Sequence, residues 1–209
     1  AFNSGKLNAS NTILVLPETY INVDFSSFYG QILSSYLRVI FNQNAYYTFG
    51  PSNPNKYQQI VDFYDSPKVL QVLSVSQDSE EFLLNHLGIA DSMHTRIFNA
   101  VEPIFVPDTS KGKIICWMPR KNTDHSQSVL LGLQRSALSL PSGWQLHPLH
   151  DLTHQQVAAS LNQSSIFLSF GHPEGFGLPI AEAMAAGNWV VGYSGGGGKE
   201  LFGFGASDQ

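Results

Sequence analysis

Short apolar runs alternate with amphipathic stretches along this chain, and the alternation predicts strands and helices in regular succession. The apolar runs are rich in β-branched and aromatic residues, which is typical of buried strands. We expect strands at 12–18, 38–44, 69–76, 113–118, 144–148, 165–170 and 188–193. We expect helices at 27–37, 77–87, 126–137, 154–161 and 179–186. This order predicts an α/β protein with mostly parallel sheets that helices cover on both faces.

Residues 99–113 interrupt this succession with few helix or strand signals. Pro103, Pro107, Asp108 and Gly112 fall in this stretch, and such residues are frequent in linkers between domains. We therefore expect a boundary near residue 107, with one domain at 1–107 and a second at 108–209. The Pro-, Asn- and Ser-rich stretch 50–55 predicts a loop within the first domain.

The composition of the chain limits the classes of function that it can have. With 43% hydrophobic and 13% charged residues, the 209-residue chain has ample material for a core. Its net charge of −5 argues against a nucleic-acid partner, which requires a basic face. The single cysteine, Cys116, lies in an apolar run and is expected to be a buried, unreactive thiol. No apolar run approaches the ~20 residues that span a bilayer, and the amino end lacks a signal-peptide pattern, so we expect a cytoplasmic protein.

Two carboxylates eight positions apart, Glu174 and Glu182, bracket a glycine-rich turn that follows one predicted strand and opens into a helix. Pro179 suits the first turn of that helix and Gly187 its end. In open parallel sheets, ligands bind beyond the carboxyl ends of the strands. We expect Glu182 in the first helical turn, with its carboxylate facing the same crevice as Glu174.

This arrangement of groups suits a sugar nucleotide. The backbone amides of Gly175, Phe176, Gly177 and Leu178 and the start of the helix would attract an anion such as a diphosphate. The two carboxylates would bind sugar and ribose hydroxyls. The alternative is a structural strand-to-helix turn whose glutamates are a helix-start charge and a solvated loop residue, because glycine turns before helices are common in α/β proteins.

The motif Glu-x7-Glu, its inner Gly-Phe-Gly-Leu-Pro and the trailing Glu-Ala-Met-Ala-x-Gly resemble the retaining glycosyltransferases of group 1, often called GT4. The resemblance extends over residues 60–202 and is strongest at 164–200. It implies the GT-B fold, with two Rossmann-like domains of parallel strands. Measured against that fold, both domains look incomplete, with an acceptor-side domain at 1–107 and a donor-binding domain at 108–209.

The resemblance implies transfer of a hexose from a nucleoside diphosphate sugar to an acceptor hydroxyl, with retention, in surface polysaccharide or glycolipid synthesis. Glu174 is the expected catalytic residue at the sugar, and Glu182 the residue at the ribose. No metal or other cofactor is expected. The expected partners are the donor and a saccharide or lipid-linked acceptor, and a peripheral contact with the inner face of the membrane is compatible with this role. The oligomeric state cannot be predicted.

Arg120 and Lys121 directly follow the predicted strand 113–118. They would therefore lie at the same edge of the sheet as Glu174 and could bind the diphosphate. Family members similarly place an arginine after this strand and a lysine a few residues later, where this chain has His125. The alternative for Arg120 and Lys121 is a pair of solvated loop cations.

Alternatives remain open for the function of the chain and for the roles of its glycine run and three of its histidines. The chain could be a non-catalytic sugar-nucleotide-binding fragment or subunit, or a sugar-nucleotide epimerase of the same fold. The glycines at 195–198 could bring the backbone close to a phosphate or sugar, or could form a flexible turn. His147, His150 and His154 have a spacing that could suit zinc, but Pro148 interrupts the helix this would need, and surface histidines are the expected alternative.

Overall fold

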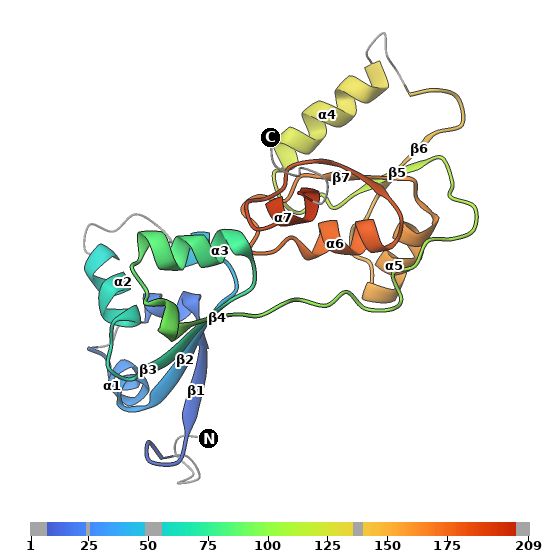
Figure 1. Cartoon of the computed structure of the whole chain (residues 1–209). Coiled ribbons are helices and arrows are strands. Elements are labelled where there is room, and N and C mark those ends of the chain that lie inside the picture. Colours follow the sequence, from blue (N-terminus) through green and yellow to red (C-terminus); the bar gives the residue numbers. More distant parts are fainter. Residues whose placement is uncertain (1–7, 24–25, 49–55, 136–139, 204–209) are drawn as a thin grey trace. The chain divides into compact units, whose positions relative to one another are not determined.

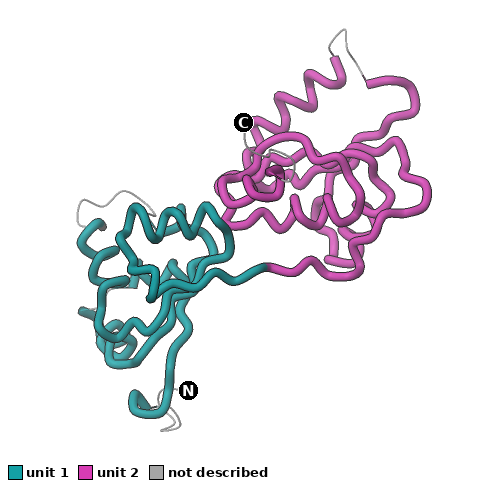
Figure 2. Tube along the Cα trace, in the orientation of Figure 1, with its two compact units in different colours: residues 1–98 teal, residues 99–209 magenta. Residues whose placement is uncertain are grey.

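The structure is a computed structural model of the chain and describes residues 8–23, 26–48, 56–135 and 140–203. The chain forms two compact units, residues 1–98 and 99–209 (Figure 2). Each unit contains a four-stranded parallel sheet with helices packed against it (Figure 1). The predicted α/β class with parallel sheets is therefore confirmed.

The sheet of the first unit has its strands in chain order. They are β1 (Ile13–Pro17), β2 (Leu37–Asn42), β3 (Val69–Ser74) and β4 (His94–Arg96). Its helices are α1 (Phe28–Ser35), α2 (Lys56–Tyr64) and α3 (Gln77–Glu81), and α3 continues into a π-helical turn over Phe82–His86. Three short 3₁₀ turns, Glu18–Asn22, Ala45–Thr48 and Asp91–Met93, complete the connections.

Helix α2 and strand β4 do not appear among the elements expected from the sequence. Helix α2 is rich in aromatic and β-branched residues, which favour strands when taken alone, and it forms where Ile60 and Phe63 are buried in the core. Strand β4 has the polar sequence His-Thr-Arg and pairs with the end of β3. Tertiary packing therefore decides both elements. The loop expected at 50–55 lies outside the described residues.

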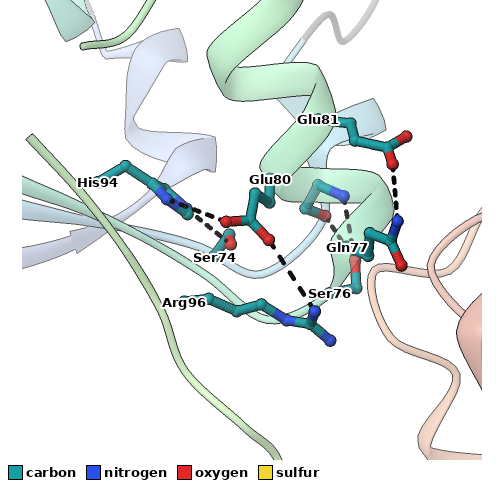
Figure 3. Close-up of polar contacts among 8 residues, drawn as sticks. Ser74, Ser76, Gln77, Glu80, Glu81, His94 and Arg96 are labelled. Atoms are coloured by element: carbon teal, nitrogen blue, oxygen red, sulfur yellow. Dashed lines mark hydrogen bonds and ion pairs between the residues drawn. The ribbon is translucent and has the colours of Figure 1, made fainter. Parts of the chain in front are cut away.

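A polar network joins α3 to the two strands beside it (Figure 3). The Ser74 hydroxyl lies 2.9 Å from His94 Nε2, and the Glu80 carboxylate lies 3.6 Å from His94 Nδ1. The second Glu80 oxygen lies 3.9 Å from the Arg96 guanidinium. Ser76 caps α3 by accepting a hydrogen bond from the Ser79 amide at 3.1 Å. Together these contacts fix the helix on the carboxyl-terminal ends of β3 and β4.

Arg38 on β2 is a buried guanidinium in the same unit. Its side chain faces the ring of Phe63 with Cζ 5.8 Å from the centroid, and only 3% of the residue is exposed. Among the residues that the structure describes, neither Nε nor Nη1 has a hydrogen-bond partner, and burial lowers the pKa of the guanidinium. A buried donor without an acceptor costs free energy that an apolar side chain of similar length would not.

We therefore expect Arg38→Met to raise the free energy of unfolding by about 1–3 kcal/mol. Urea unfolding of the purified chain would measure the change. Arg96→Met is the matched control, since Arg96 pairs with Glu80 and lies 4.8 Å over the Phe98 ring, so its loss should destabilise. Destabilisation by both substitutions would show that Arg38 contributes to the stability of the native state.

The sheet of the second unit has the order β6-β5-β7-β8, all parallel. Its strands are β5 (Ile114–Trp117), β6 (Gln145–Pro148), β7 (Ile166–Ser169) and β8 (Trp189–Gly192). Its helices are α4 (Thr123–Arg135), α5 (His154–Gln163), α6 (Leu178–Ala185) and α7 (Lys199–Phe202). Figure 1 shows α5 and α6 on one face of this sheet and α4 on the other. None of the helices in the described ranges is long and apolar enough to span a bilayer.

The core of this unit lies between the sheet and helices α5 and α6. Cys116 and Phe167 from the strands pack with Leu161 and Ala183 from the helices. Cys116 is 0% exposed, and burial raises the pKa of its thiol, so it is the unreactive cysteine that the sequence predicted. The Lys111 ammonium donates to the carbonyls of Leu161, Asn162 and Ala186 and so binds the ends of both helices.

The units divide between Phe98 and Asn99, ahead of the boundary expected near residue 107. The difference arises because residues before 107 pack on the second unit. Phe105 is 3% exposed and belongs to its core. The Asn162 side chain accepts from the Val106 amide at 3.0 Å and donates to the Ile104 carbonyl at 2.9 Å. Residues 97–113 contain neither helix nor strand, in agreement with the few helix or strand signals at 99–113, and the strand expected from residue 113 begins at Ile114.

Candidate active site

Three loops of the second unit meet at the carboxyl edge of its sheet. They follow β5, β7 and β8, which are neighbours in the order β5-β7-β8. The β5–α4 loop carries Arg120 and Lys121, and the β7–α6 loop carries Glu174. The third loop contains the glycines at 195–198. Because parallel strands end at one edge, residues distant in sequence are brought together here.

An ion pair joins two of these loops. The Lys121 ammonium lies 2.9 Å from Glu174 Oε1, and it also donates to the Pro173 carbonyl at 2.7 Å. The two side chains are 22% and 19% exposed, so the pair is only partly accessible to water. An ion pair on the open surface typically contributes less than about 1 kcal/mol, and partial burial weakens the screening by water while it adds a desolvation cost. The predicted proximity of Lys121 and Glu174 is thus observed.

A cavity of about 40 Å³ lies beside this pair. Its polar lining comes from Arg120, Lys121, Ser169 and Glu174, and Gly177 closes it at the start of α6. The cavity could hold roughly three water molecules at ~10–15 Å³ each. A phosphoryl-sized group would therefore fit within it, whereas a larger ligand would extend over the open edge of the sheet.

The turn before α6 has the local geometry that its sequence predicts. Gly177 precedes the helix with φ of 84°, a left-handed conformation that favours glycine, and Pro179 lies in the first turn. The Gly177 carbonyl accepts from the amides of Ile180 and Ala181. Gly187, with φ of 77°, follows the last helical residues. In the described part of the chain, no protein acceptor is assigned to the amides of Gly175, Phe176, Gly177 or Leu178.

The glycines at 195–198 support the Glu174 loop. The Glu174 amide donates to the Gly195 carbonyl at 2.7 Å, and the Glu174 carbonyl accepts from the Gly197 amide at 3.0 Å. A Cβ at Gly195 would lie 2.8 Å from the Glu174 side chain, and one at Gly197 would overlap the Gly175 carbonyl. These glycines therefore allow two protein loops to approach closely. Their packing explains the glycine run without a ligand.

Glu182 occupies a different place from the one expected. It is the fifth residue of α6, so it begins the second helical turn, and it does not line the cavity beside Glu174. Its pKa is raised, chiefly by burial, and the charges that act on it are those of His154 and Glu102. The expectation of a shared crevice depended on where the helix begins, and each residue along a helix turns the side chain by about 100°.

Arg120 follows β5 as predicted and is exposed at the mouth of the cavity. In the described ranges, no ion pair or hydrogen bond is assigned to its guanidinium. His125, which stands where the family has a lysine, instead lies with Nδ1 2.9 Å from the Tyr193 hydroxyl. The amine near Glu174 is therefore that of Lys121, one residue after the arginine.

The histidines that could suit zinc by their spacing have separate neighbours. His147 faces Ser160, His150 pairs with Asp151, and His154 lies 3.3 Å from a Glu102 oxygen. Among the residues that the structure describes, no three histidine, cysteine or acidic side chains come together as a metal site would require. His172 is exposed in the loop before Glu174.

Asn122 is a site residue that the sequence did not reveal. It has a φ of 50°, and its carboxamide donates to the Phe170 carbonyl at 2.7 Å and to the His172 carbonyl at 3.4 Å. Asparagine is one of the few residues that tolerate this left-handed conformation. The only signal in the sequence was its position directly after Arg120 and Lys121.

The structure thus has two parallel four-stranded sheets, with two cations and a carboxylate in loops at the carboxyl edge of the second. The family model for glycosyl transferases group 1 matches residues 127–207, which include the turn before α6 and the glycine loop. This segment is therefore of the group 1 family, as the Glu-x7-Glu motif predicted.

Individual proteins are similar to this chain in sequence or in fold. The chain is 43% identical over 47 residues to an alpha-1,6-glucosyltransferase of Actinobacillus pleuropneumoniae serotype 7 (strain AP76), covering 22% of this chain and 14% of the relative. It resembles the crystal structure of TarM with a TM-score of 0.55 and 16% identity, covering 88% of this chain and 41% of TarM. It also resembles sucrose-phosphate synthase from Thermosynechococcus elongatus, with a TM-score of 0.61 and 13% identity, covering 96% of this chain and 60% of the synthase. The structural matches share the GT-B fold, and the chain spans less than two thirds of each of these proteins.

Proposed function

We propose that this chain binds a nucleoside diphosphate sugar at the carboxyl edge of the second sheet and transfers its hexose to an acceptor hydroxyl with retention. The observation that carries the proposal is the Lys121–Glu174 ion pair beside a cavity that Arg120 also lines. Two cations and a partly buried carboxylate match a ligand with an anionic diphosphate and a hydroxyl-rich sugar. In this proposal the transfer needs no metal ion, because Arg120 and Lys121 would neutralise the charge of the diphosphate instead.

The proposed roles of the site residues follow from the charges that develop on the donor during transfer. Departure of the nucleotide leaves negative charge on the diphosphate and positive charge on the sugar. Arg120, Lys121 and the amides of residues 175–178 would stabilise the diphosphate. Glu174 would lie at the sugar, where its carboxylate accepts hydroxyl hydrogens and stabilises the positive ring.

The existing ion pair implies an exchange of partners when the donor binds. Lys121 contacts Glu174 in the structure, so a diphosphate would compete with this carboxylate for the ammonium. Movement of Lys121 to the phosphate would release Glu174 toward the sugar. Binding of the leaving group and activation of the sugar site would then be coupled.

The acceptor and the biological process are proposed from the relatives. The Actinobacillus protein is named a glucosyltransferase, and a mutant of S. aureus TarM, with a TM-score of 0.53 to this chain, has a crystal structure with UDP and alpha-GlcNAc-glycerol. We propose a glucose or related hexose as the transferred sugar and a saccharide or lipid-linked acceptor. Synthesis of a surface polysaccharide or glycolipid in the cytoplasm fits these partners.

A thermal-shift panel of UDP-, GDP- and ADP-glucose tests the proposal. A ligand that binds only the native state raises the melting temperature. We expect one nucleotide series to do so. Glu182 lies outside the cavity beside Glu174, and we propose that it binds the ribose beyond that cavity, so Glu182→Gln should weaken nucleotide binding by about 1–3 kcal/mol. Glu81→Gln is the matched control, since Glu81 lies in the first unit and accepts a hydrogen bond from Gln77. No shift with any of the three sugars would contradict the proposal.

Assays of turnover distinguish transfer from the two alternatives. A non-catalytic binding subunit would show the thermal shift but neither transfer nor slow hydrolysis of the donor. An epimerase would convert the sugar without any acceptor. The proposed transferase would release nucleoside diphosphate faster when an acceptor is added.

A further inference from the structure

Asn122 connects the loop that carries the cations to the loop that carries Glu174. Its backbone carbonyl accepts from the Ser126 amide at 3.0 Å at the start of α4. Its side chain reaches in the other direction, to the carbonyls of Phe170 and His172 in the β7–α6 loop. One residue thus fixes both the beginning of α4 and the backbone that leads to Glu174.

The left-handed φ of Asn122 is what allows this double role. A residue with φ of 50° reverses the chain sharply after Lys121, and most side chains avoid this region. Asparagine tolerates it and offers a side-chain N–H pair to the neighbouring carbonyls. Alanine would lack the donors and disfavour the conformation, whereas glycine would lack only the donors.

The other side of the Glu174 loop is fixed independently. The amide and carbonyl of Glu174 are bound to Gly195 and Gly197, so the β8–α7 loop holds its backbone from one side. Asn122 and Lys121 bind the residues just before it from the other. The position of the Glu174 carboxylate relative to Lys121 therefore depends on the contacts that Asn122 makes.

We propose that Asn122 is a positioning residue that sets the distance between the cations of the β5–α4 loop and the carboxylate of Glu174. The inference rests on the proposed function of these two groups. Asn122 itself does not line the cavity, so it would act through Lys121 and the Glu174 loop. Misplacement of a reacting group by about 1 Å can lower a rate by on the order of 100-fold.

The test compares Asn122→Gly with wild type in two measurements. Turnover of the donor identified by the thermal-shift panel should fall by on the order of 10- to 100-fold. The dissociation constant for the matching nucleoside diphosphate, measured by calorimetry, should stay within about twofold, because Arg120, Lys121 and the backbone amides are all retained and only their distance from the Glu174 carboxylate changes. Asn122→Asp, which keeps the size and the left-handed tolerance but loses the donors, should lower turnover similarly and serves if the glycine variant fails to fold.

Asp151→Gly is the matched control. Asp151 also has a left-handed φ, 54°, and lies outside the three loops, so its replacement gives glycine the same backbone freedom. Turnover of Asn122→Gly equal to that of Asp151→Gly would overturn the inference. Parallel losses of melting temperature, diphosphate affinity and turnover would also overturn it, since they indicate a structural role alone. Absence of donor binding in wild type would instead contradict the proposed function.

Discussion

Replacing Glu174 by glutamine is expected to lower turnover by about 10²–10³-fold while leaving the affinity for a bare nucleoside diphosphate equal or higher. The amide keeps the shape of the carboxylate but cannot stabilise the positive sugar of the transition state. It also no longer forms an ion pair with the Lys121 ammonium, which lies 2.9 Å from Oε1 in the native protein. Its amide oxygen can still accept a hydrogen bond, but Lys121 would give up a neutral partner in place of a charged one when it binds the diphosphate.

Turnover is expected to fall while the affinity for the diphosphate does not, so the result separates a role of Glu174 in catalysis from a role in the fold. A residue that served only the fold would lower both quantities together. Turnover with saturating donor and calorimetric titration of the nucleoside diphosphate measure them separately. Glu81→Gln is again the charge-matched control, and it should change neither. A loss of diphosphate affinity in Glu174→Gln as large as its loss of turnover would contradict the proposed division of roles.

The sequence contains most of the information about the turn before α6. Gly177, Pro179 and Gly187 each occupy a position where only a few residue types fit the backbone, so their places could be predicted locally. The edge that brings Lys121 to Glu174 could also be predicted, because strands of a parallel sheet end on one side. These predictions required no knowledge of packing between distant residues.

The features that the sequence did not reveal depend on such packing. Glu182 is the fifth residue of α6 because the helix begins at Leu178, and it does not line the cavity beside Glu174, since each residue along a helix changes the side-chain direction by about 100°. The contacts of Asn122 join loops 48 and 50 residues apart. Strand β4 exists because β3 offers it an edge, since its own three residues carry no apolar pattern.

The glycine run at 195–198 shows how one pattern can have two causes. Its sequence was equally compatible with a close approach to a ligand and with a flexible turn. In the structure the close approach is to protein, since Gly195 and Gly197 bind the backbone of Glu174 on both sides. The run thereby contributes to the site indirectly, by holding the loop that carries the carboxylate.

Replacing Arg120 by alanine is expected to weaken binding of a nucleoside diphosphate by about 1.5–3 kcal/mol, the usual range for a hydrogen bond to a charged group. The guanidinium lies at the mouth of the cavity and offers a planar fork that can contact two phosphate oxygens. Arg120→Lys keeps the charge without the fork, so it should retain only part of the affinity. The corresponding nucleoside, which has no phosphate, should bind all three proteins equally.

Calorimetric titrations at one fixed salt concentration measure these affinities, because screening by salt would otherwise mimic the loss of a charge. Arg135→Ala is the matched control: Arg135 ends α4, on the opposite end of the helix from the cavity, and its loss changes the net charge equally. Unchanged diphosphate affinity in Arg120→Ala would mean that Arg120 is a solvated loop cation. The phosphate would then have to be bound by Lys121 and the amides of Gly175, Phe176, Gly177 and Leu178, and the ion pair with Glu174 would become the main determinant of donor affinity.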